Sequence, residues 1–279
     1  MGPSQAPSKR NRTMKDDLRL CRSLLFLPAS NPRAIEKARG LDADMVVLDL
    51  EDAVKPADKD RARAAAVEAA AGFPGLCAIR VNSDGPWLKA DLDAVRSSAA
   101  DYVIVPMTSS PDSPRRAADA TGKPVMAMIE TARGVLAAAA IAPETVGLIA
   151  GTNDLSADLG LRPGAARAGL TTALQSILIA ARAAGVAAFD GVYNRLDDAE
   201  GFAAQCEEGR TFGFDGKSLI HPGQIEAANR LFGPSAGEVE AARALIAAAT
   251  GGAERYGDEM IEAMHIAQAR ALLAKARIA

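Results

Sequence analysis

The chain has 279 residues, of which 49% are apolar, and a formal net charge of -3 at pH 7. This length and apolar content are typical of one large α/β domain with its own core. The charge is spread along the chain and leaves no basic stripe to neutralise a phosphate backbone, which argues against nucleic acid as a partner.

The three cysteines and the start of the chain indicate a reducing compartment. Cys21, Cys77 and Cys206 lack the paired spacing of a zinc site or a disulfide framework, so we expect buried free thiols. No apolar run approaches the roughly 18 residues that cross a bilayer, and residues 1–17 lack the apolar core of a signal peptide. We therefore expect a cytoplasmic protein without a membrane partner. The polar segment 1–18 is predicted to be a disordered leader.

From residue 19 onward, short apolar runs recur at intervals that leave room for one helix each. Such continuous runs are typical of parallel strands that are buried on both faces. The intervening segments, for example Lys59–Ala71 and Thr171–Ala184, carry apolar residues at helical spacing. Eight strands are predicted: Leu24–Ala29, Met45–Glu51, Leu76–Asn82, Tyr102–Met107, Pro124–Glu130, Val146–Thr152, Ala187–Val192 and Gly216–Ile220.

Eight strand and helix units predict a closed (β/α)8 TIM barrel over residues 19–232. An open doubly wound sheet is the alternative. It is disfavoured because polar residues end many successive strands instead of gathering at one switch point. In addition, no Gly-x-Gly-x-x-Gly follows the first strand.

Residues 233–279 are predicted to form a C-terminal helical extension. Gly233-Pro234 ends the last helix of the barrel. Two further helices are expected over Glu238–Ala249 and about 258–276, and residues 250–252 between them read as a hinge. The second helix could therefore reach a neighbouring subunit.

Two carboxylates stand where a barrel enzyme holds its reacting groups. Glu130 and Asp154 each follow a predicted strand, and the ends of those strands face the βα loops. Two hard oxygen ligands with open positions suit Mg²⁺, with Mn²⁺ possible. The alternative is that the two side chains cap the helices that follow them.

Arg80 ends an apolar strand, so its guanidinium should lie in the same mouth. Its planar fork can bind a carboxylate or a developing enolate oxygen. The alternative is an ion pair with Asp49 or Glu51, which alternate along their strand and should point the same way, while Asp52 should point opposite. We expect Glu51 to be a water-mediated partner of the metal or of the arginine, and Asp52 to be a solvated loop acid.

The backbone of Gly151, Thr152 and Asn153 precedes Asp154 and could receive a substrate carboxylate as at a helix N-terminus. A plain turn is the alternative.

The cations after the second predicted strand have less specific roles. Lys55, Lys59 and Arg61 could reach the phosphates of a CoA ligand or simply cover a solvated helix face. His221 is expected to have a packing or interface role.

Six segments in order resemble the citrate lyase β-subunit-like family from about residue 22 to residue 231. No one of them is specific alone, but their order and spacing are. They are Arg22–Ala29, Leu48–Val54, Ile79–Asn82, Met128–Thr131, Gly151–Leu155 and Phe214–Pro222.

The resemblance implies a metal-dependent TIM-barrel lyase that cleaves a 3-hydroxy-3-carboxy acyl thioester of the malyl, citramalyl or citryl type. The products would be a 2-oxo acid and an acyl thioester, with CoA or a carrier protein as the thiol. It also implies a homo-oligomer, commonly a trimer. The family places an arginine like Arg22 near the substrate, although its N-terminal position fits the bottom of the barrel equally.

The C-terminal segment departs from the family pattern. Thioester-cleaving relatives supply an aspartate to the neighbouring subunit as acid or base, and here Glu262 stands at that position without the following proline. An added methylene can move a carboxylate enough to remove about two orders of magnitude in rate. Two alternatives therefore stay open: a metal-dependent aldolase for a free 4-hydroxy-2-oxo acid, and a non-catalytic relative that binds an oxo acid or an acyl carrier.

Overall fold

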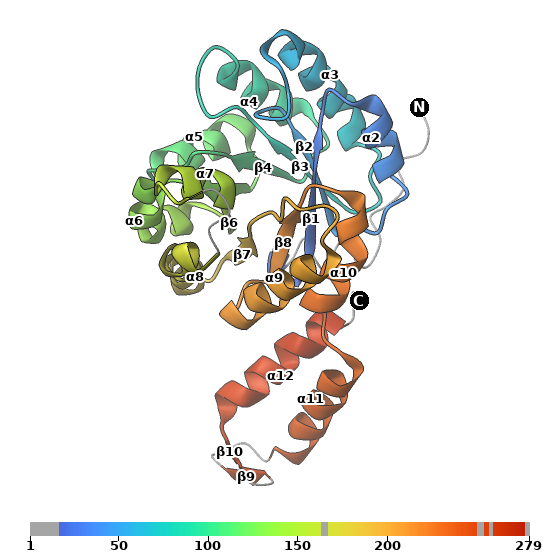
Figure 1. The fold of residues 1–279 in the computed structure, drawn as a ribbon, viewed down its shortest axis with the longest axis vertical. Coiled ribbons are helices and arrows are strands. Elements are labelled where there is room, and N and C mark those ends of the chain that lie inside the picture. The colour runs from blue at the N-terminus through green and yellow to red at the C-terminus, as the bar shows by residue number, and fades with distance from the viewer. Residues whose placement is uncertain (1–16, 163–166, 250–253, 257–258, 277–279) are drawn as a thin grey trace.

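Eight parallel strands form one closed barrel, β1 to β8 in chain order, which confirms the predicted TIM barrel (Figure 1). The computed structural model describes residues 17–162, 167–249, 254–256 and 259–276. Each strand lies inside its predicted run, except that β1 begins one residue earlier. The strands are β1 Ser23–Pro28, β2 Met45–Asp49, β3 Leu76–Arg80, β4 Tyr102–Val105, β5 Val125–Ile129, β6 Gly147–Ala150, β7 Ala187–Asp190 and β8 Gly216–Leu219.

Helices follow the strands and cover the outside of the barrel (Figure 1). The α-helices are α2 Pro32–Ala38, α3 Lys59–Ala70, α4 Leu88–Ser97, α5 Asp112–Thr121, α6 Ala132–Ile141, α7 Thr152–Asp158, α8 Thr171–Ala184, α9 Ala199–Phe212, α10 Ile225–Phe232, α11 Ala236–Ala248 and α12 Ala263–Ala276. Short 3₁₀ helices are η1 Leu18–Leu20, η2 Pro56–Asp58, η3 Ala142–Glu144, η4 Arg167–Leu170 and η5 Pro222–Gln224.

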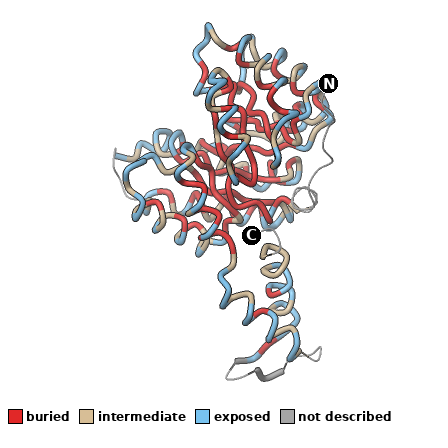
Figure 2. Tube along the Cα trace, turned by 90° about the vertical axis from the view of Figure 1, so that its right-hand side faces the viewer, coloured by how far each residue is buried: buried red, intermediate tan, exposed pale blue. Residues whose placement is uncertain are grey.

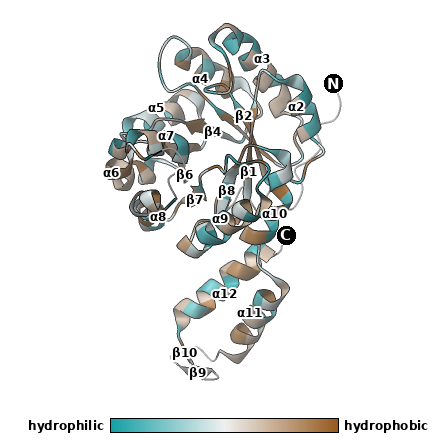
Figure 3. Ribbon diagram, viewed as in Figure 1, coloured by the Kyte–Doolittle hydropathy of each residue, from teal (hydrophilic) through white to brown (hydrophobic). Residues whose placement is uncertain are grey.

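The apolar core has two layers because successive strand residues face opposite sides of the sheet. On β2, Met45 and Val47 belong to a cluster inside the barrel, whereas Val46 and Leu48 pack with residues of the surrounding helices. Figure 3 shows the apolar character of the strands that results. Because apolar residues fill most of both faces, the polar groups of the site gather at and beyond the carboxyl ends of the strands.

The base of the barrel includes residues that we expected in a disordered leader. The side chain of Asp17 caps η1 by accepting a hydrogen bond from the N–H of Arg19. Leu18 is buried inside the barrel cluster. The leader prediction is therefore wrong for these two residues, and its remainder lies outside the described residues.

Helices α11 and α12 pair with each other and stand away from the barrel as an arm (Figure 1). Most of the arm is exposed or half-buried (Figure 2). Its second helix begins at Ala263, five residues later than predicted, because Glu259–Ile261 forms strand β10 instead. This strand pairs antiparallel with β9, Glu254–Tyr256. The predicted hinge at 250–252 lies outside the described residues.

The helices of the described segments give no sign of a membrane span. None of them combines the length and the apolar character that crossing a bilayer requires. The three cysteines are free and buried, as predicted.

Candidate active site

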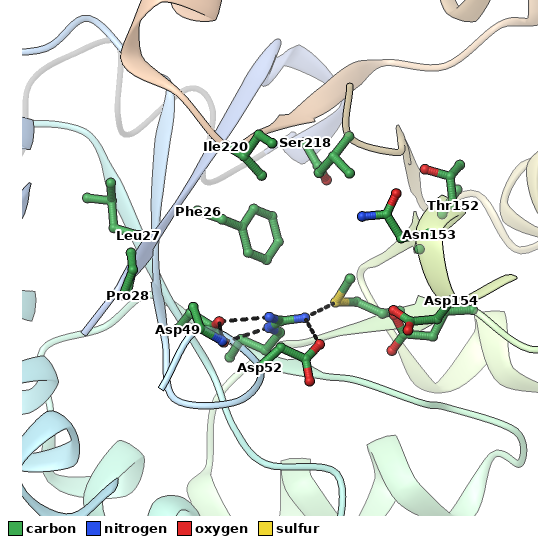
Figure 4. A pocket seen from close by; sticks show the side chains of 17 residues that line it. Phe26, Leu27, Pro28, Asp49, Asp52, Thr152, Asn153, Asp154, Ser218 and Ile220 are labelled. Carbon is green, nitrogen blue, oxygen red and sulfur yellow. Dashed lines mark hydrogen bonds and ion pairs between the residues drawn. The ribbon is translucent and has the colours of Figure 1, made fainter. Parts of the chain in front are cut away.

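A cavity of about 400 Å³ opens where the strands end, at the mouth of the barrel (Figure 4). Such a volume suits a small ligand or the head group of a larger one. One wall is apolar and the rest carries charged and polar groups. The lining residues are Phe26, Leu27, Pro28, Asp49, Asp52, Ala53, Arg80, Met128, Glu130, Ala150, Gly151, Thr152, Asn153, Asp154, Val192, Ser218 and Ile220.

Glu130 follows β5 and is almost fully buried. Its Oε1 accepts a hydrogen bond of 2.5 Å from the N–H of Met107. Met107 has φ 48°, a left-handed conformation that is strained for a residue with a side chain. Burial raises the pKa of Glu130 to about 7, although the Met107 N–H and the charge of Arg80 act in the opposite direction. The backbone is thus bent to hold one oxygen of this carboxylate.

Gly151 makes room for the same carboxylate. A Cβ at this position would lie 2.4 Å from both Cβ and Oε2 of Glu130. Real Cβ contacts are not that short, so only glycine lets the end of β6 pass beside Glu130. Gly191, after β7, plays a similar part, because its Cβ would lie 2.3 Å from Oγ1 of Thr152. No motif in the sequence marks this second glycine.

Asp154 lies in the first turn of α7 and lines the same cavity as Glu130. Its negative charge contributes to the raised pKa of Glu130. Neither acid caps a helix by its side chain: Thr131 caps α6, and Gly151 occupies the N-cap of α7. The capping alternative is therefore wrong, and two carboxylates face one cavity.

A divalent cation between these two acids would find only part of its ligand set in the protein. Within the described residues, no group of three or more His, Cys, Asp or Glu side chains is placed to hold a metal ion. Mg²⁺ commonly binds one or two carboxylates and takes its other ligands from water and substrate oxygens. The donor set of Glu130 and Asp154 fits that pattern.

Arg80 is held by a network of acids beside this pair. Its Nε and Nη2 each donate to Asp49 over 2.7 Å, and its Nη1 lies 3.1 Å from Oε2 of Glu51. The guanidinium also stacks 5.5 Å from the ring centre of Phe26. The ion pair that was the alternative interpretation of Arg80 is therefore present, and Arg80 also lines the cavity. Asp52 is a solvated loop acid, as predicted, with 71% of its side chain exposed. It does not point away from the site, because β2 ends at Asp49; it lines the cavity, with Oδ2 3.8 Å from Nη1 of Arg80.

Glu51 combines a buried position with an unusual acidity. Burial raises its pKa to about 8, an effect that Arg80 opposes and the nearby acids Asp52 and Glu130 increase. Burial thus favours the protonated form of this carboxyl group, whereas the contact with Arg80 favours the carboxylate. Only the protonated form can donate a hydrogen bond to a ligand.

Lys59 has a structural role, which corrects the hypothesis that it binds the phosphates of a CoA ligand. It is buried, and its Nζ donates to the carbonyl oxygens of Leu50 and Glu51 over 2.7 Å each and to Oδ1 of Asn82 over 2.6 Å. It therefore fixes the loop after β2 and is not available for the phosphates of a CoA ligand. Arg61 is exposed and pairs with a neighbouring aspartate.

The segment Gly151, Thr152 and Asn153 lines the cavity as predicted, but its backbone is only partly free. The N–H of Gly151 donates to the carbonyl of Ile129 over 3.0 Å as part of the sheet, so it cannot receive a substrate carboxylate. The side chain of Asn153 is exposed and accepts a hydrogen bond of 2.6 Å from Asn194.

Arg22 is not part of the cavity. It precedes β1 at the amino end of the barrel, where its Nε and Nη2 donate to the two carboxylate oxygens of Asp44 over 2.9 and 3.0 Å. Nη1 donates to the carbonyl of Asn229, and the side chain is buried. Arg22 therefore lies at the bottom of the barrel, as its position before the first strand allowed. The prediction that it contacts the substrate is wrong.

Glu262 and His221 also lie outside the cavity lining. Glu262 is exposed on the arm, and its N–H donates to Nδ1 of His265 over 2.9 Å. His221 caps η5 by accepting from the N–H of Gly223. Its local role is therefore capping.

Ser218 is a lining residue that sequence reasoning missed. It lies on β8, is 2% exposed, and its hydroxyl has no hydrogen-bond partner among the described residues. The signal for it was the alternation along β8, because the outward Lys217 pairs with Asp190 and the next residue must face inward. No comparable signal existed for the backbone of Met107.

Residues 22–222 match the HpcH/HpaI aldolase/citrate lyase family, and the chain belongs to it. It is 45% identical to a (3S)-malyl-CoA thioesterase of Cereibacter sphaeroides, over 91% of this chain and 94% of that protein. It is 36% identical to the citrate lyase subunit beta of Leuconostoc mesenteroides, over 82% of each. Its fold matches CitE of Mycobacterium tuberculosis in complex with magnesium, acetoacetate and coenzyme A, with a TM-score of 0.79, 32% identity, and coverage of 93% of this chain and 99% of that one.

Proposed function

We propose that this protein is a Mg²⁺-dependent enzyme that cleaves a carbon–carbon bond in a malyl-type CoA thioester. The observation that carries the proposal is the meeting of Glu130, Asp154 and Arg80 in one cavity at the barrel mouth. A relative named for malyl-CoA and a similar fold that binds magnesium and coenzyme A support the choice of substrate class. For malyl-CoA itself the products would be glyoxylate and acetyl-CoA.

Glu130 and Asp154 would hold the cation, with substrate oxygens and water completing its shell. When bound, the ion supplies positive charge that polarises the hydroxyl and carboxylate of the substrate. The protein contributes a fixed position for one ligand, since the N–H of Met107 holds Oε1 of Glu130 and Gly151 leaves room for Oε2.

As the bond between C2 and C3 breaks, the hydroxyl would lose its proton to water, and the carbon of the resulting enolate would take a proton from water. Arg80 would stabilise the negative charge that develops on the thioester oxygen. Asp49 holds its guanidinium through two hydrogen bonds, so the fork does not have to be ordered during the reaction. Glu51 lies 3.1 Å from Nη1, and its raised pKa would let its protonated form donate a hydrogen bond to the same oxygen. Together they form a preorganised site for an enolate.

Hydrolysis of the thioester is a second candidate reaction, and the name of the thioesterase of Cereibacter sphaeroides favours it. Water would then attack the thioester carbonyl, with malate and free CoA as products. The same arginine would stabilise the oxyanion, so the two reactions share most of the site. They differ in which bond breaks, the bond between C2 and C3 or the bond between carbon and sulfur.

One assay separates these outcomes. The purified protein is incubated with Mg²⁺ and malyl-CoA, and the products are identified by chromatography. Glyoxylate with acetyl-CoA supports carbon–carbon cleavage, malate with free CoA supports hydrolysis, and the absence of both contradicts the proposal. Citramalyl-CoA and a free 4-hydroxy-2-oxo acid, run side by side, test the acyl group and the need for a thioester.

Variants link the activity to the two acids. Asp154→Asn should abolish turnover and weaken Mg²⁺ binding. The matched control Asp119→Asn, an exposed residue of α5, should leave both unchanged. An equal loss in both variants would contradict the metal-binding role of Asp154.

We also propose that the active form is a homo-oligomer, a trimer by the family resemblance. In it, Glu262 would act as acid or base in the cavity of a second copy. Glu262 is exposed on an arm that stands away from the barrel (Figure 1). Met260 and Met264 beside it are 63% and 56% exposed, an apolar pair that a second copy would cover.

Mixing two inactive variants tests this arrangement. Glu262→Ala and Asp154→Asn each lack one part of the site, so mixed oligomers should regain part of the wild-type activity. Light scattering gives the oligomeric state in the same samples. A stable oligomer without complementation would contradict the shared site.

A further inference from the structure

Ser218 presents a buried hydroxyl without a partner to the cavity. Its side chain is 2% exposed, it lines the cavity, and its Oγ makes no hydrogen bond with the described residues. Strand β8 places it there, because Lys217 on the opposite face is fixed by its ion pair with Asp190 and by Gln205. The hydroxyl therefore cannot turn to the helix layer for a partner.

A buried polar group without a partner is destabilising, and native proteins rarely keep one without a reason. Alanine or another apolar residue would suit the surrounding core better. The apolar residues of the cavity lining, among them Val192, Phe26 and Ile220, offer no acceptor through their side chains. A partner therefore has to come from water or from a ligand in the cavity.

The position of Ser218 in the cavity indicates what that partner is. Figure 4 shows Ser218 close to Ile220 and across the cavity from Asp49 and Asp52. Both of these acids pair with Arg80. A ligand that reaches Arg80 and the two carboxylates would lie between these walls. Its oxygen atoms are the only strong acceptors that such a ligand offers to a hydroxyl.

We propose that Ser218 is a substrate-binding residue whose hydroxyl donates a hydrogen bond to an oxygen of the acyl head group. This inference rests on the proposed function, since it assumes that a small hydroxy or oxo acid group occupies the cavity. It adds a binding point on the wall that otherwise carries apolar side chains. That point selects ligands with an oxygen at this place over ligands with a methyl group.

Ser218→Ala tests the inference by two readouts that should move in opposite directions. Calorimetric titration of the Mg²⁺-loaded protein with oxaloacetate and with pyruvate measures binding without any turnover. We expect the affinity for at least one acid to fall by about tenfold or more, as for one hydrogen bond to a charged oxygen. The melting temperature without ligand should stay the same or rise, because the substitution removes an unpaired buried hydroxyl.

Two further variants complete the design. Ser218→Thr keeps the hydroxyl and should retain more affinity than Ser218→Ala. Ser176→Ala removes an exposed hydroxyl that donates to Thr172 on α8, and it should change neither readout. A loss for both acids supports a contact with the 2-oxo acid end that they share. A loss for oxaloacetate alone supports a contact with its second carboxylate.

Unchanged affinity for both acids in Ser218→Ala would overturn the inference, because the hydroxyl would then contact water at most. A lower melting temperature of the unliganded variant would also overturn it, since the hydroxyl would then have a partner within the protein. The proposed function fails separately, if wild-type protein binds both acids but does not turn over malyl-CoA by either reaction.

Discussion

The substitution Gly151→Ala tests whether the room beside Glu130 matters for metal binding. The added Cβ would lie 2.4 Å from Cβ and Oε2 of Glu130 and 3.1 Å from its Cδ. Ordinary contacts need about 1 Å more, and because one of the atoms is a Cβ, the backbone of one strand must move. Gly151 has φ -87°, which any residue adopts, so the effect is steric.

The size of the effect follows from this overlap. Forcing a methyl group into a filled site is destabilising by about 1–3 kcal/mol, which lowers the melting temperature by several degrees in a chain of this length. A ligand displaced by about 1 Å should bind the cation about 10- to 100-fold more weakly, as when the support of a metal ligand is removed. Turnover should fall at least as far.

Calorimetric titration with Mg²⁺ and thermal unfolding measure the two consequences. Gly237→Ala is the matched control, because a Cβ at this position in α11 meets nothing within 4 Å. It should leave Mg²⁺ affinity unchanged and can stabilise the helix by up to about 1 kcal/mol. If Gly151→Ala loses stability but binds Mg²⁺ as tightly as the wild type, Glu130 is not a ligand of the metal.

Three further substitutions probe other parts of the site and the arm. Arg80→Lys keeps the charge but not the two-point bond to Asp49, so kcat/KM should fall about a hundredfold or more at unchanged Mg²⁺ affinity; near-normal kinetics would refute its role at the oxyanion. Lys59→Met leaves two buried carbonyls without a donor and should lower the free energy of unfolding by about 3 kcal/mol, measured by urea denaturation; a loss below 1 kcal/mol would mean that water replaces the ammonium. Burial lowers the pKa of Lys275 to about 8 against the attraction of Asp215. Between pH 8 and 10.5 the folded state therefore binds fewer protons than the unfolded state, and stability rises with pH. Because the side chain is partly exposed, this rise should be about 1 kcal/mol, and the difference between wild type and Lys275→Met should show it; equal pH profiles would contradict it.

The barrel could be predicted because its physics is repetitive. Each strand is buried on both faces, so each reads as a continuous apolar run followed by a helical pattern. The arm shows where this logic stops. Strand β10 spans three residues, Glu259–Ile261, too few for any periodicity, and the helical pattern of α12 extended backward over it.

The candidate site was predicted where strand ends alone decide the position of a side chain. Glu130, Asp154 and Arg80 meet as expected because they end or follow strands of one sheet. Contacts with backbone atoms that are distant in the sequence could not be predicted. The N–H of Met107 donates to Glu130 from a backbone conformation with positive φ at Met107. No local pattern in the sequence predicts that conformation.

The errors at Arg22 and Lys59 have a common cause. Both are long cations near acids, and the sequence does not show which acceptor such a side chain reaches. The structure pairs Arg22 with Asp44 below the strands and turns Lys59 toward the carbonyls of the loop after β2. In each case a buried acceptor closer in space decided the outcome.

The clamp of Arg22 and Asp44 lies at the amino end of the sheet, and the acids of the cavity lie at the other. The ion pair that ties the amino end of the sheet together is thus separate from the residues that line the cavity. A substitution in the cavity lining can therefore change the chemistry of the site and leave this ion pair in place.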